Sequence, residues 1–469
     1  EINSMEDLYH DESFRGRISS VTASGKRNWI YALQPSGKLY AFRKYLAWSC
    51  LGIFFILPFI YIRDNPLFLI NILDSRFILF GKIFWPQDFF ILALGMIFFI
   101  VFIALFTIIY GRLFCGWVCP QTVFLEFVFR KIEWIIEGSP GRQRALDESS
   151  WTFEKIWKKS LKHFLFLLFS FLIAHTFLAY IIGVKAIWQM MKEPLSQNMG
   201  TLISLSVFTL IFYGVFAFVR EIVCTTICPY GRLQGVLYDK NTMQISYDYD
   251  RGEPRGRYKK AEQRTSGDCI DCRKCVLVCP TGIDIRDGVQ MDCVGCTACI
   301  DACDEVMDKV GFPRGLIRYA SENEIAEKRK FAFTTKMKAY SAVLFLLMCS
   351  MGFMILTRTE IDTQISRIKG QLYQEVDENT LGNLFEAKII NKSLKAREVE
   401  LRPEGIQGTI KLVGLPGFRL KAESVNDFTF FLQIPKSEIR KRSNPVTIGI
   451  YENGKKVQAI HTKFLGPFQ

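Results

Sequence analysis

Eight of the fourteen cysteines lie within 35 residues, in two copies of the spacing C-x2-C-x2-C-x3-C. The first copy is Cys269, Cys272, Cys275 and Cys279, and the second is Cys293, Cys296, Cys299 and Cys303. This doubled run is a ligand pattern for two 4Fe–4S clusters, in which the fourth cysteine of each copy binds the other copy's cluster. It therefore predicts one cluster on Cys269, Cys272, Cys275 and Cys303, and the other on Cys293, Cys296, Cys299 and Cys279. The sequence indicates a protein that transfers electrons.

Zinc sites and disulfides are the alternatives for these eight cysteines. Zinc usually takes pairs of cysteines separated by a longer spacer, whereas each copy here has three close cysteines and one more. Both alternatives are therefore disfavoured. A G-x-G-x-x-G or P-loop fingerprint in a strand-to-helix context is absent from the sequence. The electron donor is thus expected to be a protein or a quinol, not a nicotinamide nucleotide.

A second cysteine motif, C-x3-C-P, occurs twice with an offset of 109 residues. Its copies are Cys115 and Cys119 before Pro120, and Cys224 and Cys228 before Pro229. Spacing i, i+4 places two sulfurs on one face of a helix, and proline is expected to end or kink that helix. Four converging thiols could hold copper or a third cluster, because soft metals prefer thiolates. Two other interpretations stay open, a redox-active thiol pair and small residues without chemistry.

Other side chains carry weaker signals. His163 and His175 lie twelve residues apart in one apolar segment, so they face about 120° apart on a helix. That separation disfavours a shared metal, although an ionisable residue inside a membrane span is a candidate for a metal, quinone or proton role. Met348, Cys349, Met351 and Met354 are soft donors that could bind copper, but methionine is also an ordinary packing residue in such a segment. Cys50 is expected to be a buried, inert thiol.

The elements that must position these residues are membrane spans. The chain has 469 residues, 41 of them Phe, with 49% hydrophobic residues and a positive mean hydropathy. Apolar segments near the 20 residues that a bilayer needs occur at about 44–62, 89–109, 162–181, 202–222 and 338–356. Four of them form a transmembrane domain, 44–222, which contains both C-x3-C-P motifs. The fifth follows the iron–sulfur segment.

Lys and Arg in the loops set the expected orientation, because cytoplasmic loops are enriched in them. Segments 110–160 and 223–337 are rich in both, whereas 182–201 has only Lys185 and Lys192. We therefore expect residues 1–43 and 223–337 in the cytoplasm, with the two-cluster domain at about 262–320, and residues 357–469 in the periplasm. The polar N-terminus indicates no signal peptide. The net charge of +13 follows these membrane flanks, so nucleic-acid binding is not expected.

The last 110 residues read as a β-domain. Short alternating runs such as 384–390, 409–413, 427–434 and 446–451 indicate strands, and Asn453-Gly454 indicates a hairpin turn. Strands of this size in about 100 residues suggest an immunoglobulin-like β-sandwich. No cysteine follows Cys349, which agrees with an oxidising side for this domain. The expected fold class is a multidomain membrane protein: an all-α five-helix transmembrane domain, an inserted two-cluster ferredoxin-like α+β domain, and this sandwich.

The sequence resembles the FixG/RdxA/CcoG-type cytochrome c oxidase accessory proteins. The resemblance covers nearly the whole chain and rests on six segments: FCGWVCPQTV (114–123), IEWIIEG (132–138), REIVCTTICPYGRLQ (220–234), CPTGIDIRDG (279–288), CVGCTACIDACDEVMDK (293–309) and GFPRGLIRY (311–319). The order of spans, ferredoxin insert and external immunoglobulin-like tail is also similar to that family. The resemblance implies a bacterial inner-membrane protein that takes part in assembling cbb3-type haem–copper oxidases.

The resemblance further implies a cupric reductase, in which the clusters supply electrons that convert Cu(II) to Cu(I). The implied partners are a copper chaperone or copper-exporting ATPase, oxidase assembly factors, and an unidentified cytoplasmic or quinol donor. Cys115, Cys119, Cys224 and Cys228 are the candidate catalytic residues. Two alternatives stay open: a quinol-linked membrane ferredoxin that reduces a partner, and a non-catalytic assembly scaffold.

Overall fold

The computed structural model describes residues 27–467, except 63–64, 72–75, 81, 85–87, 259–265, 329–331, 358, 369, 371, 394, 415–417, 423 and 440. Most of the N-terminal segment, residues 1–26, therefore lies outside the described residues. The chain divides into two compact units. Unit 1 comprises residues 1–81 and 89–351, and unit 2 comprises 82–88 and 352–469.

Within the described residues, five helices are long and apolar enough to cross a membrane, which agrees with the expected number. They are α2 (Lys38–Ile56), α3 (Phe89–Tyr110), α8 (Phe153–Ile182), α10 (Met199–Gly214) and α16 (Thr335–Leu356). The candidate spans extend α2 to Phe59 and α10 to Val219. Helix α8 begins earlier than its apolar stretch because Thr152 caps it, accepting a hydrogen bond from the backbone N–H of Lys155. Exposed aromatic and aliphatic side chains cover these helices, as expected of surfaces that face lipid.

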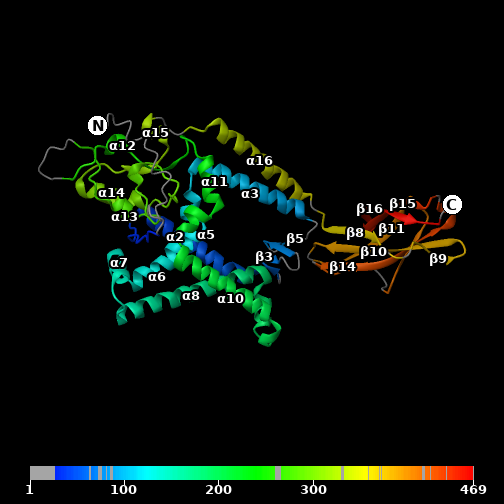
Figure 1. Cartoon of the computed structure of the whole chain (residues 1–469). Helices are drawn as coiled ribbons and strands as arrows, with labels where there is room; N and C mark the ends of the chain where they lie inside the picture. Colours follow the sequence, from blue (N-terminus) through cyan, green and yellow to red (C-terminus); the bar gives the residue numbers. More distant parts are fainter. Residues whose placement is uncertain are drawn as a thin grey trace. The chain divides into compact units, whose positions relative to one another are not determined.

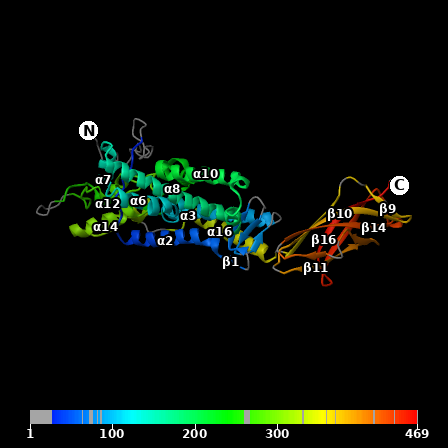
Figure 2. The ribbon, with the colours of Figure 1, turned by 90° about the horizontal axis from the view of Figure 1, so that it is seen from below.

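Short elements join the spans of unit 1 (Figures 1 and 2). After α2 come η2 (Leu57–Phe59), the antiparallel pair β1 (Tyr61–Ile62) and β2 (Asn65–Pro66), and a second pair, β3 (Phe68–Asn71) and β4 (Arg76–Leu79). Between α3 and α8 lie α4 (Leu113–Trp117), α5 (Pro120–Phe124), the π-helix η4 (Leu125–Phe129), α6 (Arg130–Ile136) and α7 (Pro140–Glu148). Between α8 and α10 lie α9 (Val184–Met190) and η5 (Leu195–Gln197). The π-helices η6 (Val215–Val219) and η7 (Val223–Ile227), then α11 (Pro229–Leu237), follow α10.

The iron–sulfur segment is a small α+β domain. Its elements are β6 (Gln244–Tyr247), α12 (Tyr249–Gly252), α13 (Lys274–Leu277), η8 (Ile285–Asp287), α14 (Ala298–Val310), β7 (Ile317–Ala320) and α15 (Glu322–Ala326), with β6 and β7 paired antiparallel. Asp301 of α14 accepts hydrogen bonds from the backbone N–H groups of Leu39 (3.2 Å) and Tyr40 (2.7 Å). This carboxylate satisfies free donors at the start of α2 and complements the positive end of its dipole. The first span is thereby fixed to the helix that carries Cys299 and Cys303.

Unit 2 is a β-sandwich, as the sequence predicts. One sheet has the order β12-β14-β10-β8, with β9 also on β10, and the other has the order β13-β11-β15-β16. The strands are β8 (Ile361–Arg367), β9 (Gln374–Asp377), β10 (Thr380–Asn391), β11 (Arg397–Glu404), β12 (Thr409–Leu412), β13 (Phe418–Leu420), β14 (Ser424–Pro435), β15 (Ser443–Glu452) and β16 (Lys455–Leu465); β5 (Lys82–Phe84) and η9 (Lys436–Glu438) also belong to this unit. Alternate residues of both sheets form one apolar core. Asn453 and Gly454 both have positive φ, as the β15–β16 hairpin turn requires.

Candidate functional site: two cluster cavities and a membrane thiol group

Two cavities in the iron–sulfur domain are each ringed by four cysteines. The outer cavity is lined by Cys269, Cys272, Cys275 and Cys303, together with apolar residues of β7 and α14. The inner cavity is lined by Cys279, Cys293, Cys296 and Cys299, and Cys275 also borders it. Each cavity thus takes three cysteines from one copy of the motif and one from the other. These donor sets fit two 4Fe–4S clusters with the predicted exchange of the fourth ligand.

Burial dominates the chemistry of these thiols. It raises the pKa of Cys275, Cys293 and Cys303 to about 12 and that of Cys296 to about 11. Because the thiolate is the form that binds metal, cluster binding must displace protons from these groups. Backbone N–H groups help at the inner cavity: Gly295 donates to Cys293 and Ala298 donates to Cys296, which lowers each pKa in part. The loops therefore supply both the ligands and the donors that a charged cluster needs.

The two C-x3-C-P motifs form a structural repeat. The N–H of Cys119 donates to the carbonyl of Phe114 (3.0 Å), and the N–H of Cys228 donates to that of Val223 (2.8 Å). Each motif is preceded at the same offset by a residue with φ of +56°, Gly111 in one copy and Arg220 in the other. A left-handed arginine is costly and is kept only where its surroundings hold it. The duplication in sequence is therefore also a duplication of backbone geometry.

The prolines of these motifs act differently from the sequence-based expectation. Pro120 and Pro229 are the first residues of α5 and α11, a position that suits proline because no N–H is needed there. Cys119 and Cys228 are the N-cap residues of those helices and have extended ψ angles of 125° and 115°. The two cysteines of a motif thus lie on either side of a helix break, not on one helical face. Each N-cap sulfur instead lies at the positive end of a helix.

The four motif thiols gather in one partly buried group, here called the thiol group (Cys115, Cys119, Cys224 and Cys228). Burial, with smaller contributions from Cys119, Cys115 and Cys228, raises the pKa of Cys224 to about 12. Burial also raises the pKa of Cys115 to about 11. Gln234 Nε2 donates to Cys115 Sγ (3.5 Å), and Thr122 Oγ1 lies 4.0 Å from Cys224 Sγ. Across the described ranges, no three His, Cys, Asp or Glu side chains lie in the arrangement that one metal ion requires.

The thiol group adjoins the inner cavity. A Cβ atom on Gly116 would lie 2.7 Å from the Val294 carbonyl oxygen and 2.8 Å from the Cys296 nitrogen. A Cβ atom on Gly295, which has φ of +70°, would lie 2.8 Å from the Arg112 carbonyl oxygen. These glycines therefore allow the first C-x3-C-P turn and the inner ligand loop to touch backbone to backbone. The Trp117 indole N–H donates to the Gly295 carbonyl (3.2 Å) and fixes this contact.

The two cavities differ in access. Cys272 is exposed at the outer cavity, whereas Cys296 and Cys299 of the inner cavity are buried. The neighbouring Arg273 and Leu277 are also exposed. A soluble reductant can therefore approach the outer cavity more closely than the inner one. The order along the molecule is outer cavity, inner cavity, thiol group.

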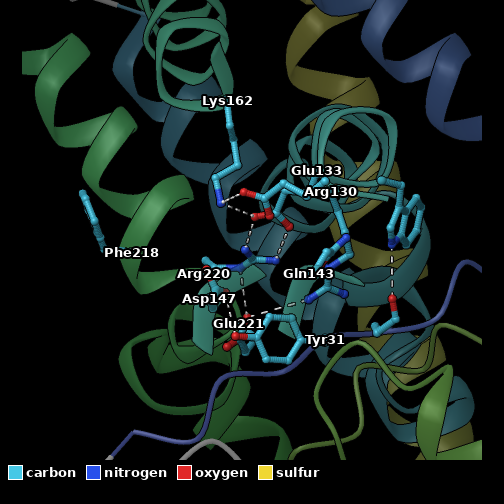
Figure 3. Close-up of polar contacts among 12 residues, drawn as sticks. Tyr31, Arg130, Glu133, Gln143, Asp147, Lys162, Phe218, Arg220 and Glu221 are labelled. Carbon is cyan, nitrogen blue, oxygen red and sulfur yellow. Dashed lines mark hydrogen bonds and ion pairs between the residues drawn. The ribbon is translucent and has the colours of Figure 1, made fainter. Parts of the chain in front are cut away.

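A buried ion network packs against the second motif, and the sequence analysis did not identify it (Figure 3). Arg220 forms a two-bond ion pair with Glu133, at 2.5 and 2.9 Å. Lys162 Nζ lies 2.9 Å from Glu137, and Arg130 Nη1 lies 2.6 Å from Glu126. These side chains come from α6, η4, α8 and the turn before Cys224, and all are at least nine-tenths buried. In the sequence, this network is marked only by charged residues that lie within or beside apolar segments.

The network holds the turn that precedes Cys224. Burial alone would raise the pKa of Glu133, but Arg220 outweighs it, and the pKa is held below its usual value with help from Lys162 and Arg130. A lowered carboxylate pKa stabilises the fold at neutral pH, and this contribution is lost as the pH falls through the folded-state pKa. Arg220 thereby keeps a strained backbone conformation four residues before a motif cysteine.

Replacing Arg220 by alanine should strongly destabilise unit 1. The change leaves the carboxylate of Glu133 buried without its main partner, which typically costs about 3–5 kcal/mol. Thermal unfolding in detergent, followed by circular dichroism, measures the effect. Arg144→Ala is the matched control, because Arg144 and Glu148 form an exposed i, i+4 pair. Equal midpoints for the two variants would contradict a structural role for the network.

The remaining candidates lie apart from the cysteine sites. His163 Nδ1 lies 2.9 Å from the Tyr213 hydroxyl oxygen, and the His175 ring packs against Phe171. The two histidines have separate partners, consistent with the prediction that they do not share a metal. Cys349 is exposed on α16, and no described His, Cys, Asp or Glu joins it in a metal-holding group. Cys50 is partly, not fully, buried.

Three family models match the chain. A 4Fe-4S dicluster domain matches residues 219–322, and a 4Fe-4S binding domain matches residues 92–138. A model described as the IG-like fold at the C-terminal of FixG matches residues 351–467. The first match contains Cys224, Cys228 and the eight cavity cysteines, and the second contains Cys115 and Cys119. The two iron–sulfur clusters and the immunoglobulin-like sandwich inferred above thus have independent support.

Curated relatives extend the similarity over most of the chain. Protein RdxA of Cereibacter sphaeroides is 33% identical over 398 residues, which cover 81% of this chain and 83% of the relative. Protein RdxB of the same organism is 32% identical, covering 80% and 82%. Nitrogen fixation protein FixG of Rhizobium meliloti is 35% identical over 321 residues, covering 66% and 60%. The similarity includes both the membrane helices and the iron–sulfur segment.

Proposed function

The chain belongs to the family of RdxA, RdxB and FixG, and we propose that it reduces Cu(II) to Cu(I) at the thiol group. It is an iron–sulfur electron-transfer protein of the membrane, with two 4Fe–4S clusters. The observation that carries the proposal is the backbone contact of Gly116 with the inner ligand loop. It brings the turn of the first C-x3-C-P motif against the loop that carries the inner ligands Cys293 and Cys296.

The chemistry of the thiol group suits copper as a substrate. When bound, 4Fe–4S clusters supply single electrons, and the conversion of Cu(II) to Cu(I) consumes one electron and no proton. Thiolates stabilise Cu(I) relative to Cu(II), so ligation by Cys115, Cys119, Cys224 and Cys228 favours reduction. Copper that binds only transiently does not require the four sulfurs to form a complete coordination site beforehand. The Cu(I) product must also be able to dissociate. Gln234 and Thr122, which touch Cys115 and Cys224, are placed to orient these sulfurs.

The proposed setting is the bacterial inner membrane during assembly of a cbb3-type oxidase. Loop charge favours a cytoplasmic N-terminus and iron–sulfur domain and a periplasmic β-sandwich. The reductant is then a cytoplasmic protein that approaches near Cys272, the exposed outer ligand. The Cu(I) product passes to a copper chaperone or a copper-exporting ATPase. The cysteine-free β-sandwich is available to bind an oxidase assembly factor.

Anaerobic mixing of the purified, dithionite-reduced protein with Cu(II) tests the proposal. A Cu(I)-specific chelator should report about one Cu(I) for each electron stored in the clusters, while cluster absorbance returns to the oxidised value. The as-purified oxidised protein is the control and should form none. Absence of Cu(I) while the clusters remain reduced would contradict the function. Iron analysis shows what the thiol group binds. About eight irons per chain would leave it free for copper, whereas about twelve would mean that it holds a third cluster.

A quinol-linked electron carrier is the second candidate function, and a groove between α8 and α10 favours it. Leu168, Phe171, Leu205 and Thr209 are among its lining residues, and its volume is about 400 Å³. His163 immediately precedes the lining residue Phe164 in the sequence and is hydrogen-bonded to Tyr213. An isoprenoid tail fits an apolar groove, and this His–Tyr pair suits a quinol head. Cluster reduction by menaquinol in the experiment above, without a response to Cu(II), would select this function.

A further inference from the structure

The membrane part of unit 1 places two buried arginines beside the loop that carries the inner ligands Cys293 and Cys296. Arg43 of α2 is 1% exposed, and its Nε donates to the Gly116 carbonyl (2.7 Å). Arg112, next to α4, is 6% exposed and donates to the Gly231 carbonyl. Gly116 packs against Val294 and Cys296, and the Arg112 carbonyl lies against Gly295. Both arginines are therefore held at the loop that carries the ligands of one cluster.

Each of these arginines has an unused donor. Arg43 Nη2 and Arg112 Nε are buried without a hydrogen-bond partner among the described residues. Neither side chain forms an ion pair within 4 Å in the described part of the chain. Burying a cation without a counter-charge is costly, so an anionic group is expected beside them. A cluster held by four thiolates is anionic and accepts hydrogen bonds at its sulfur atoms.

The outer cavity has the opposite balance. Two arginines line it, and both are paired: Arg286 lies 2.6 Å from both Asp271 and Asp284, and Arg273 Nε lies 3.8 Å from Asp271. Two carboxylates thus offset two cations there. Unpaired positive charge near the inner cavity stabilises the electron that reduction adds to a cluster there. At the outer cavity the positive charge is neutralised by carboxylates, so this stabilisation is weaker. Charge and hydrogen bonds to sulfur both set cluster potentials.

We propose that Arg43 and Arg112 are positioning residues that give the inner cluster a higher reduction potential than the outer cluster. Electrons then move from the exposed outer site towards the thiol group. Arg112 contacts both ends of this step, because its carbonyl lies against Gly295 of the inner ligand loop and its guanidinium donates to the carbonyl of Gly231, just after the second C-x3-C-P motif. The inference rests on the electron route of the proposed function, but it concerns only the order of the two potentials. Its failure is therefore separable from a failure of copper reduction.

A redox titration followed by EPR on the full-length protein tests the inference. The outer signal is assigned with Cys272→Ser, which changes an exposed ligand of that cluster alone. In the wild type, the signal that Cys272→Ser leaves unchanged should appear first as the potential is lowered. Arg43→Gln and Arg112→Gln should each lower the reduction equilibrium constant of that cluster roughly tenfold, which is 59 mV for one electron. The outer signal should not move.

Charge-retaining and distant variants serve as controls. Arg43→Lys and Arg112→Lys keep the cation and should restore most of the shift, which a purely structural role would not explain. Arg314→Gln removes an exposed arginine of the same domain that pairs with Asp308 and should shift neither signal. If a glutamine variant loses iron, the order in which the two clusters of the wild type are reduced tests the inference by itself. Prior reduction of the outer cluster, with copper reduction intact, would overturn the inference and leave the proposed function standing.

Discussion

Replacing Cys115, Cys119, Cys224 and Cys228 together by alanine is expected to abolish Cu(II) reduction while leaving both clusters in place. Residues that only support a metal ligand already change affinity or activity 10–100-fold. Loss of all four sulfurs should therefore lower the rate by more than about 100-fold. The cavity cysteines lie on different loops, so iron content should stay at about eight per chain. The rate of Cu(I) formation by the dithionite-reduced variant is the measurement.

Two further cysteines provide the control for this variant. Cys50 lies in α2 and Cys349 in α16, and neither belongs to the thiol group or lines a cluster cavity. The double variant Cys50→Ala, Cys349→Ala also removes thiols from the membrane part, and it should reduce Cu(II) at the wild-type rate. Unchanged Cu(I) formation by the quadruple variant would show that copper is reduced elsewhere, for example directly at an exposed cluster. The activity would then stand, but the site would be wrong.

Removing the fourth cysteine of either copy is expected to damage the cluster of the other copy. Cys303 lines the outer cavity and Cys279 the inner one. Cys303→Ala should therefore remove the EPR signal that Cys272→Ser alters, and Cys279→Ala should remove the other signal. Each variant should keep about four of the eight irons. These are the largest effects expected from single substitutions, because a cubane that loses a ligand is exposed to solvent and oxidant.

The assignment of signals decides this prediction. If ligands were not exchanged, Cys279→Ala would remove the same signal that Cys272→Ser alters, and the ligand sets given above would be wrong. Val276 is a suitable control position, because it lies between Cys275 and Cys279 and lines neither cavity. Val276→Ala should keep both signals and about eight irons.

Features carried by local sequence patterns were predictable here. The doubled cysteine run gives its ligand sets by spacing alone, and the five spans follow from uninterrupted apolar length. In the sandwich, alternation within 427–434 and 446–451 marked the cores of β14 and β15, and Asn453-Gly454 marked their neighbouring hairpin. Each signal lies within a few residues of the structure that it predicts. The motifs Cys115–Cys119 and Cys224–Cys228 were likewise visible as a repeat.

Features that depend on distant contacts were not predictable. Arg43 contacts Gly116 across 73 residues and Arg220 contacts Glu133 across 87, and no periodicity in one sequence marks such pairs. The helix break at Cys119 was misjudged because proline can either end a helix or begin one, and only its position as the first helical residue decides. Gly295 gave no signal of its own, since its role depends on the backbone of Arg112.

Rapid-freeze EPR after mixing the fully reduced protein with Cu(II) tests the central claim most directly. The claim is an ordered route from the outer cavity through the inner cavity to copper at the thiol group. The Cu(II) signal should fall while the outer cluster is oxidised first, because the inner cluster passes its electron to copper and, having the higher potential, is refilled from the outer cluster. In the quadruple cysteine variant, both cluster signals should persist. Oxidation of both clusters at an unchanged rate in that variant would contradict the account.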